Sequence, residues 1–264
     1  MKKYLADYHM HTSFSVDGEV PMEQMVTKAI ELGLNEIAIT DHVDYGIKHE
    51  SICDYDNYFK KIEELQIKYQ DQIVIKKGIE FGIQKETIPL YERDFNKYEF
   101  DFIIMSNHEV GGLEFWNYEF QKGKTQKEYQ EEYYLAILYL VQHYKDYSVL
   151  GHLDMIKRYD QAGDYPDEKI MSLVKEIFKT VIKDNKGIEI NSSSFQYGLK
   201  DLTPSYQILK TYYDLGGRII TIGSDSHEAK YISSHFDDIK TVLKEIGFKQ
   251  YCVFTKMKPT FYDL

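Results

Sequence analysis

Positive charge and cysteine are scarce in this sequence. Its 32 lysines and arginines stand against 43 aspartates and glutamates, giving a formal net charge of −11. A protein that binds a long nucleic acid is usually basic because it must neutralise phosphates, so this composition argues against a nucleic-acid partner. Cys53 and Cys252 lie far apart and form no CxxC pair, which argues against a disulfide framework and a thiolate zinc site.

Long apolar runs are also missing. No run approaches the roughly 20 residues that a membrane-spanning helix needs. The first residues, MKKYLADYHMH, become polar before the apolar core of a signal peptide could form. We therefore expect a soluble, cytoplasmic protein with no membrane partner.

Short β-rich apolar runs alternate with longer segments of helical periodicity. The seven strand candidates are residues 4–9, 36–40, 73–80, 102–106, 148–151, 187–191 and 218–223. Residues 21–33 and 170–181 carry apolar side chains at helical spacing, and Thr125 with Glu128 matches a capping box. Pro204 is expected to open a further helix. This alternation predicts parallel strands joined by right-handed crossovers.

The number of these units predicts the fold. We expect residues 1–264 to form a single α/β domain, a distorted (β/α)7 barrel that is similar to a TIM barrel. Such barrels reach this length as one unit. An open doubly wound sheet is the alternative, and the lack of a glycine-rich phosphate loop after any strand weakens it.

Metal-ligating residue types gather just after the predicted strands. They are His9, His11, Asp41, His42, Glu80, His108, His152, Asp225 and His227. The carboxyl ends of parallel barrel strands meet at one face, where active sites lie. Asp7, His9 and His11 are two residues apart and so point to one side of an extended chain. Imidazole and carboxylate together suit zinc, manganese or iron, so we expect a metal centre. His49, His143 and His235 lie elsewhere and are expected to be ordinary histidines.

The ordered motifs DYHMHTSFSVDG, ITDH, GIEFG, SNH, GHLD, EIN and GSDSH resemble those of the polymerase-and-histidinol-phosphatase (PHP) family, within the amidohydrolase superfamily. They run from residue 7 to residue 227, and the set is similar to that of stand-alone histidinol-phosphatases of the Gram-positive type. The resemblance implies a trinuclear centre of three divalent ions, zinc, manganese or iron. It implies three ligand groups, which are His9, His11 and Asp225 for the first ion, His108 and His152 for the second, and His42 and His227 for the third. Glu80 matches the carboxylate that bridges the first two ions.

One expected ligand departs from the family pattern. Many relatives supply a histidine to the third ion from the loop after the first strand, and here the candidate is Asp17. An oxygen ligand would favour a harder metal such as manganese or iron. Asp7 and Asp41 are expected to orient imidazoles from outside the ligand set.

The resemblance implies hydrolysis of L-histidinol phosphate to L-histidinol and phosphate, in L-histidine biosynthesis. A hydroxide held between the first two ions would attack phosphorus, and Glu80, Asp17, His42 and Arg158 would be the catalytic residues. Arg158 would contact the phosphate, and the alternative is that it forms a surface ion pair. Gln196 or Lys200 is expected to supply the second phosphate contact that relatives make with a basic residue.

The 107–124 loop is expected to cover a small substrate pocket. Glu109 or Glu114 would bind the substrate amine, and Trp116 or Phe115 would pack near its imidazole; the alternative is that these residues only pack the loop. The expected partner is thus a small phosphomonoester, and no oligomeric state is assigned. Three other functions remain open at this stage, namely a phosphotyrosine-protein phosphatase, a phosphodiesterase or exonuclease acting on nucleotides, and a non-catalytic metal-binding protein.

Overall fold

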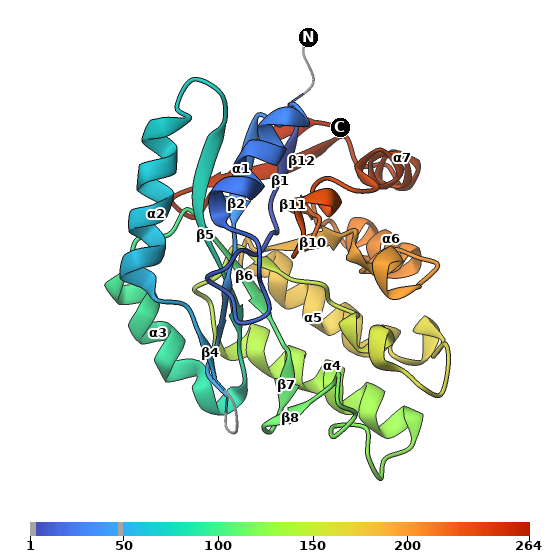
Figure 1. Cartoon of the computed structure of the whole chain (residues 1–264). Coiled ribbons are helices and arrows are strands. Elements are labelled where there is room, and N and C mark those ends of the chain that lie inside the picture. The colour runs from blue at the N-terminus through green and yellow to red at the C-terminus, as the bar shows by residue number, and fades with distance from the viewer. Residues whose placement is uncertain (1–3, 47–49) are drawn as a thin grey trace.

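The structure, a computed structural model, describes residues 4–46 and 50–264. In this described part of the chain, seven parallel strands form the centre (Figure 1). In spatial order they are β1 (Ala6–Asp7), β2 (Glu36–Ile39), β5 (Val74–Gly82), β6 (Phe102–Ser106), β9 (Val149–Leu150), β10 (Gly187–Asn191) and β11 (Ile220–Gly223). Every neighbouring pair along this path is parallel, and each of the seven predicted strands overlaps one of these strands, although β5 continues to Gly82 past the predicted end at Glu80.

The last strand returns to the first. The backbone N–H of Tyr8 donates to the carbonyl of Ile222 over 3.0 Å, and the N–H of Asp225 donates to the carbonyl of His9 over 2.8 Å. A parallel bridge also joins Met10 to Ser226. These contacts make a nearly closed barrel, which confirms the predicted distorted seven-stranded barrel and excludes the open doubly wound sheet.

Within the described residues, seven α-helices surround the strands (Figure 1). They are α1 (Met22–Glu31), α2 (Tyr55–Lys68), α3 (Ile88–Lys97), α4 (Gln126–His143), α5 (Met171–Lys183), α6 (Tyr206–Asp214) and α7 (Phe236–Ile246). The Thr125–Glu128 capping box is present at the start of α4. The α6 helix begins later than predicted, because Ser205 rather than Pro204 precedes it and accepts a hydrogen bond from the N–H of Ile208. None of the described helices is long and apolar enough to cross a bilayer.

Several short elements were not predicted from the sequence. Besides α3, they are β3 (His42–Asp44), β4 (Ser51–Ile52), β7 (Glu109–Val110), β8 (Leu113–Glu114), β12 (Gln250–Thr255) and β13 (Lys258–Asp263), with 3-10 turns η1 (Lys85–Thr87), η2 (Met155–Tyr159), η3 (Asp167–Lys169), η4 (Ser193–Tyr197) and η5 (Ala229–Tyr231). Two of these elements matter for the site. The β3 strand extends the sheet beside the end of β5, with His42 opposite Glu80. The antiparallel β7–β8 hairpin follows β6.

The β12–β13 hairpin covers the amino-terminal end of the barrel. The Tyr251 hydroxyl donates to the carbonyl of Tyr4 over 2.8 Å, and the N–H of Phe254 donates to the Tyr8 hydroxyl over 2.7 Å. The Tyr8 hydroxyl in turn donates to the buried carboxylate of Glu36. The amino-terminal end is therefore filled by side chains, and the carboxyl ends of the strands face the opposite way.

Candidate metal centre and active site

The structure brings all nine expected metal ligands to the carboxyl ends of the strands. Six of them are buried, namely His9, His11, Glu80, His108, His152 and Asp225. His42 and His227 are half-buried, and Asp17 is exposed. Among the described residues, overlapping groups of three such side chains have donor atoms within 4.8 Å of one another. Of the remaining histidines, His143 and His235 lie outside these groups, and His49 lies outside the described residues.

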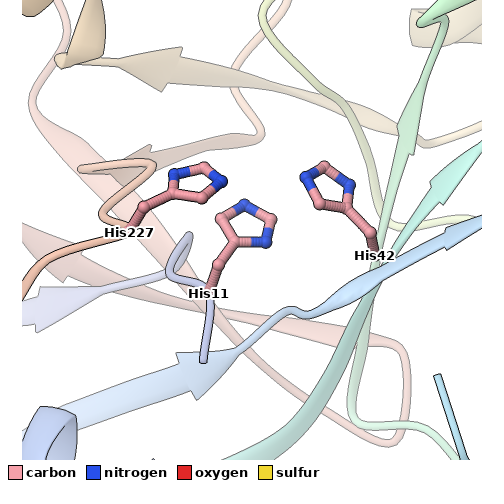
Figure 2. A group of neighbouring side chains, drawn as sticks. All are labelled: His11, His42 and His227. Carbon is pink, nitrogen blue, oxygen red and sulfur yellow. The ribbon is translucent and has the colours of Figure 1, made fainter. Parts of the chain in front are cut away.

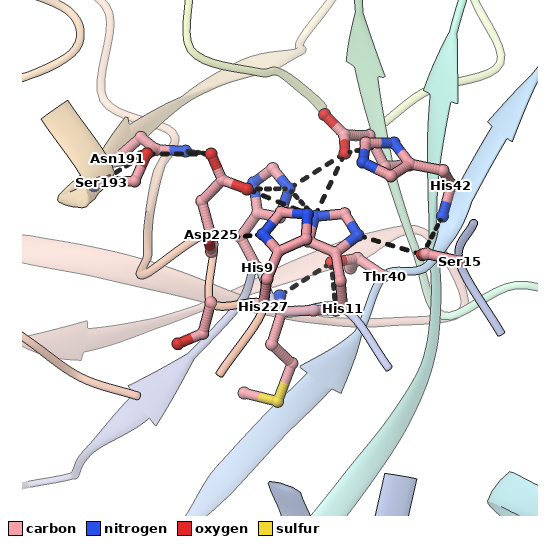
Figure 3. Close-up of polar contacts among 12 residues, drawn as sticks. His9, His11, Ser15, Thr40, His42, Asn191, Ser193, Asp225 and His227 are labelled. Carbon is pink, nitrogen blue, oxygen red and sulfur yellow. Dashed lines mark hydrogen bonds and ion pairs between the residues drawn. The ribbon is translucent and has the colours of Figure 1, made fainter. Parts of the chain in front are cut away.

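The first group consists of His9, His11, Glu80 and Asp225. The two Nε2 atoms of His9 and His11 are 3.0 Å apart, and Glu80 Oε2 lies 3.1 Å from the first and 3.5 Å from the second. Asp225 Oδ1 is 3.5 Å and 3.3 Å from the same two nitrogens (Figure 3). Ligand bonds of about 2.1 Å in a tetrahedron place donors about 3.4 Å apart. These four side chains therefore fit one shared cation, which would separate their facing lone pairs.

The second group shares Glu80 with the first. Glu80 Oε1 lies 2.9 Å from His152 Nε2 and 3.3 Å from His108 Nε2. The same oxygen accepts a hydrogen bond of 2.6 Å from Ser106 Oγ. One carboxylate thus presents a different oxygen to each of two donor groups, which is the geometry that a bridging ligand requires.

The third group is the most open of the three. The imidazoles of His11, His42 and His227 point toward one another (Figure 2), and the His11 ring stacks at 4.2 Å on each of the other two. Asp17 Oδ2 lies 3.0 Å from His227 Nε2 and 3.6 Å from His42 Nε2. Asp17 therefore occupies the place of the oxygen ligand expected from the sequence.

Two carboxylates outside the expected set fix imidazoles in place. Glu189 Oε1 lies 2.5 Å from His9 Nδ1, and Asp44 Oδ1 lies 2.9 Å from His108 Nδ1. A Cβ atom at Gly82 would come within 1.6 Å of the Asp44 oxygen and 2.6 Å of the His108 nitrogen, so only glycine fits beside this pair. Such partners select the ring tautomer and leave Nε2 free for a metal. Neither Glu189 nor Asp44 was predicted from the sequence.

The residues predicted to orient imidazoles act differently. Asp7 accepts backbone hydrogen bonds from Ser224 at 2.9 Å, Ser233 at 3.0 Å and His9 at 3.3 Å, so it fixes the backbone of His9 and does not orient an imidazole directly. Asp41 accepts a hydrogen bond of 2.6 Å from Ser15 Oγ. The same Ser15 Oγ atom lies 3.3 Å from His11 Nδ1. Asp41 therefore reaches an imidazole through Ser15, while Asp7 fixes the backbone beside β11.

The buried carboxylates of the centre are ionised and can bind a cation. Burial by itself would raise the pKa values of Glu80 and Asp225, yet the neighbouring histidines hold both well below the ordinary range. Burial, followed by repulsion from His42 and His227, lowers the pKa of His11 to about 3. The centre therefore offers ionised carboxylates, and their attraction outweighs burial and raises the pKa values of His9, His42 and His108. A bound metal would take the place of the protons on these imidazoles. Buried carboxylates need such a compensating charge.

A cavity of about 470 Å³ opens over the metal-ligating groups. Arg158 lines it with a side chain that is only 3% exposed, which rules out the surface ion pair. Its Nη2 atom donates to Ser193 Oγ at 2.7 Å, to Asp225 Oδ2 at 3.2 Å and to Asn191 Oδ1 at 3.4 Å. Its Nε atom is buried without a hydrogen-bond partner among the described residues.

An aromatic side chain stands where a second basic residue was expected. The Arg158 guanidinium lies 4.6 Å from the ring centre of Tyr197, which lines the cavity. Gln196 and Lys200 are not among the residues that line it. Tyr197, the last residue of η4, was missed because a lone aromatic residue in a short turn carries no sequence signal for contact with an arginine.

The β7–β8 hairpin forms one wall of the cavity. Glu109, Glu114 and Trp116 all line it, and Trp116 is 45% exposed. Phe115 instead lies in the core, against Phe120 at 5.0 Å and Tyr133 at 5.3 Å between ring centres. The predicted contact of Phe115 with the substrate is therefore wrong, while the other three residues face the space where a substrate would bind.

Fold and site together define a metal-binding α/β barrel. A family model described as "PHP domain" matches residues 7–193, and the chain belongs to this family. The histidinol-phosphatase of Lactococcus lactis subsp. lactis (strain IL1403) is 36% identical over 267 residues, covering 98% of this chain and 96% of that protein. A probable histidinol-phosphatase of Clostridium acetobutylicum is 31% identical, covering 97% and 96% respectively.

A solved structure extends the likeness to three dimensions. It is the crystal structure of histidinol phosphate phosphatase from the same Lactococcus lactis strain, complexed with zinc, L-histidinol and phosphate. It matches with a TM-score of 0.88 and 33% identity, over 98% of this chain and all of that one. A neighbour from Listeria monocytogenes, at 22% identity and a TM-score of 0.77, supports the fold.

Proposed function

We propose that this protein is a histidinol-phosphatase, which hydrolyses L-histidinol phosphate to L-histidinol and phosphate. The observation that carries the proposal is the cavity, in which metal-ligating groups and Arg158 face the wall made by Glu109, Glu114 and Trp116. The likeness over the full length to the Lactococcus lactis enzyme, which was crystallised with zinc, L-histidinol and phosphate, supports the same substrate.

We further propose a centre of three divalent ions, drawn from zinc, manganese and iron. Glu80 would bridge the first two ions, because its two oxygens face different donor groups. Asp17, His42 and His227 would hold the third ion at the mouth of the cavity. Bound divalent ions activate water for attack and stabilise negative charge on phosphoryl oxygens.

Arg158 would bind the phosphate of the substrate. Its Nη2 atom is held by Asp225 and Ser193, so the guanidinium is fixed before substrate arrives. A donor fixed in advance requires no reorganisation when charge develops on the transferring group. The guanidinium, which lines the cavity, would then donate to a phosphate oxygen, and the Tyr197 ring would shield it on one side.

Glu109 and Glu114 would receive the protonated amine of the substrate, and Trp116 would pack against its imidazole. We expect Glu109→Gln or Glu114→Gln to lower kcat/KM for histidinol phosphate by roughly 10-fold or more, because a charged contact becomes a neutral one. A phosphomonoester without an amine should be hydrolysed at an unchanged rate. Steady-state kinetics with both substrates make the comparison. Equal losses on both substrates, or none on either, would exclude these glutamates as partners of the amine.

The other enzymatic functions fit this cavity less well. A phosphotyrosine-protein phosphatase needs an open cleft, whereas the β7–β8 hairpin walls this cavity. An exonuclease would have to draw a polyanion toward a rim that carries Glu50, Glu109 and Glu114. A non-catalytic metal protein would have no use for a buried arginine that lines the cavity beside the metal-ligating groups.

A substrate screen tests the proposed function directly. Metal-reconstituted enzyme would be assayed with histidinol phosphate, a phosphotyrosine peptide, nucleoside monophosphates and a short oligonucleotide. We expect kcat/KM for histidinol phosphate to exceed that for each of the others by roughly 100-fold or more, because paired polar groups in a pocket reject ligands that leave them unpaired. A higher value for the peptide or the oligonucleotide would refute the proposal.

A further inference from the structure

Gln84 lies outside the metal centre and follows the end of β5. Its side chain is 3% exposed and contacts the β7–β8 hairpin twice. Gln84 Oε1 accepts a hydrogen bond of 2.8 Å from the N–H of Gly112, and Gln84 Nε2 donates to Glu109 Oε2 over 2.9 Å. One buried amide therefore holds both the turn of the hairpin and a carboxylate that lines the cavity.

The backbone of Gln84 is itself fixed. Its N–H donates to Thr87 Oγ1 over 3.0 Å, and the Thr87 hydroxyl donates to the Gln84 carbonyl over 3.1 Å. The amide of Asn107 adds a nearby connection, since its Nδ2 atom donates to the carbonyls of Ile83 at 3.0 Å and Glu109 at 2.8 Å. The segment after β5 thus serves as the rigid support against which the hairpin rests.

The hairpin needs such a support. Each of its strands has two residues, and its turn places Gly111 and Gly112 at φ values of 60° and 70°. Two-stranded hairpins are marginally stable by themselves, so outside contacts set their position. Glu109 and Glu114 are direct partners across the two strands, and like charges in that arrangement repel each other. The hydrogen bond from Gln84 opposes a rotation of the Glu109 carboxylate away from the cavity.

We propose that Gln84 is a positioning residue for substrate selection, which holds the Glu109 side of the cavity in place without touching the substrate. The inference rests on the proposed function, in which a glutamate of the hairpin receives the substrate amine. Gln84 is connected to the hairpin and has no hydrogen bond to a proposed metal ligand among the contacts of the described residues. Its loss should therefore affect substrate binding more than chemistry.

Gln84→Leu removes both contacts at nearly constant volume. We expect KM for histidinol phosphate to rise by roughly 10-fold, as for the loss of a hydrogen bond to a charged group, with kcat within about 2-fold. Kinetics on p-nitrophenyl phosphate, which has no amine, should stay at the wild-type level. Hydrogen exchange at the Gly112 amide should become faster. Gln66→Leu is the matched control, because it removes a glutamine hydrogen bond to the carbonyl of Ile75 away from the cavity and the hairpin.

Gln84→Glu separates the two contacts. It keeps an acceptor for the Gly112 amide and replaces the donor to Glu109 with a like charge, so slow exchange at Gly112 should persist while KM for histidinol phosphate still rises. An unchanged KM in Gln84→Leu, or equal losses on both substrates, would overturn the role of Gln84 even where Glu109→Gln proves selective. Unchanged selectivity in Glu109→Gln and Glu114→Gln would instead remove the proposed amine site, and the role of Gln84 with it.

Discussion

Replacing Glu80 by alanine should lower bound metal and kcat together. Both carboxylate oxygens of Glu80 face donor groups, so a single substitution removes a ligand from two proposed ions. Loss of a residue that only hydrogen-bonds to a metal ligand costs about 10- to 100-fold in metal affinity or activity. Because Glu80 would itself be a ligand, we expect kcat to fall by at least about 100-fold. Metal analysis should give three ions per chain in fully loaded wild-type protein and fewer in the variant.

The control for this experiment is another buried glutamate. Glu36 is 3% exposed and accepts hydrogen bonds from Tyr4 and Tyr8 at the opposite end of the barrel. Glu36→Gln should leave metal content unchanged, whatever it does to the free energy of unfolding. Wild-type metal content and rate in folded Glu80→Ala would refute the bridge. One ion or none in carefully loaded wild-type protein would refute the trinuclear centre.

The sequence was most informative where strands end. The apolar run at 102–106 coincides with β6, because a strand that is buried on both faces needs a largely continuous apolar run. The alternating segment 187–191 coincides with β10. The polar residues directly after the predicted strands were expected to lie close together, because the carboxyl ends of the strands of a parallel barrel share one face. Closure was harder to predict, because it depends on hydrogen bonds between residues as distant as Tyr8 and Ile222.

Glu189 was missed although the sequence contained a signal for it. In β10, Glu189 and Asn191 alternate with Ile188 and Ile190, so both polar side chains point to one side of the strand. A buried carboxylate on that side needs a partner, and the partner is His9. Asp44 carried no comparable signal, since its contact with His108 depends on the packing of the short β3 strand against β5.

The walls of the cavity were the least predictable part. The β7–β8 hairpin has two residues per strand, too few for a periodic pattern. Its glycine pair, Gly111–Gly112, was the available sign of a tight turn, since both residues adopt positive φ. The buried position of Phe115 and the exposed position of Trp116 follow from packing against α4, which neighbouring residues in a sequence cannot reveal.

Replacing Arg158 by alanine should lower kcat/KM by an amount on the order of 2–4 kcal/mol, as expected for a buried charged contact. The structural reason is that a buried guanidinium, held by Asp225 and Ser193, lines the cavity. Arg158→Lys should recover part of the loss, because lysine restores the charge without the planar arrangement of donors. Kinetics on histidinol phosphate and on an amine-free phosphomonoester should show similar losses, since both substrates carry the phosphate.

Metal content decides how such a loss is interpreted. Arg158 donates to Asp225 Oδ2, while Asp225 Oδ1 faces the first metal-ligating group, so removing the arginine could act through the metal. Binding of the phosphate would be indicated by full metal occupancy together with reduced kcat/KM. Arg218→Ala is the matched control, because that guanidinium stacks on Tyr213 at 3.9 Å away from the cavity. Wild-type kinetics in folded, fully loaded Arg158→Ala would show that the phosphate is held by the metal-ligating groups without this arginine.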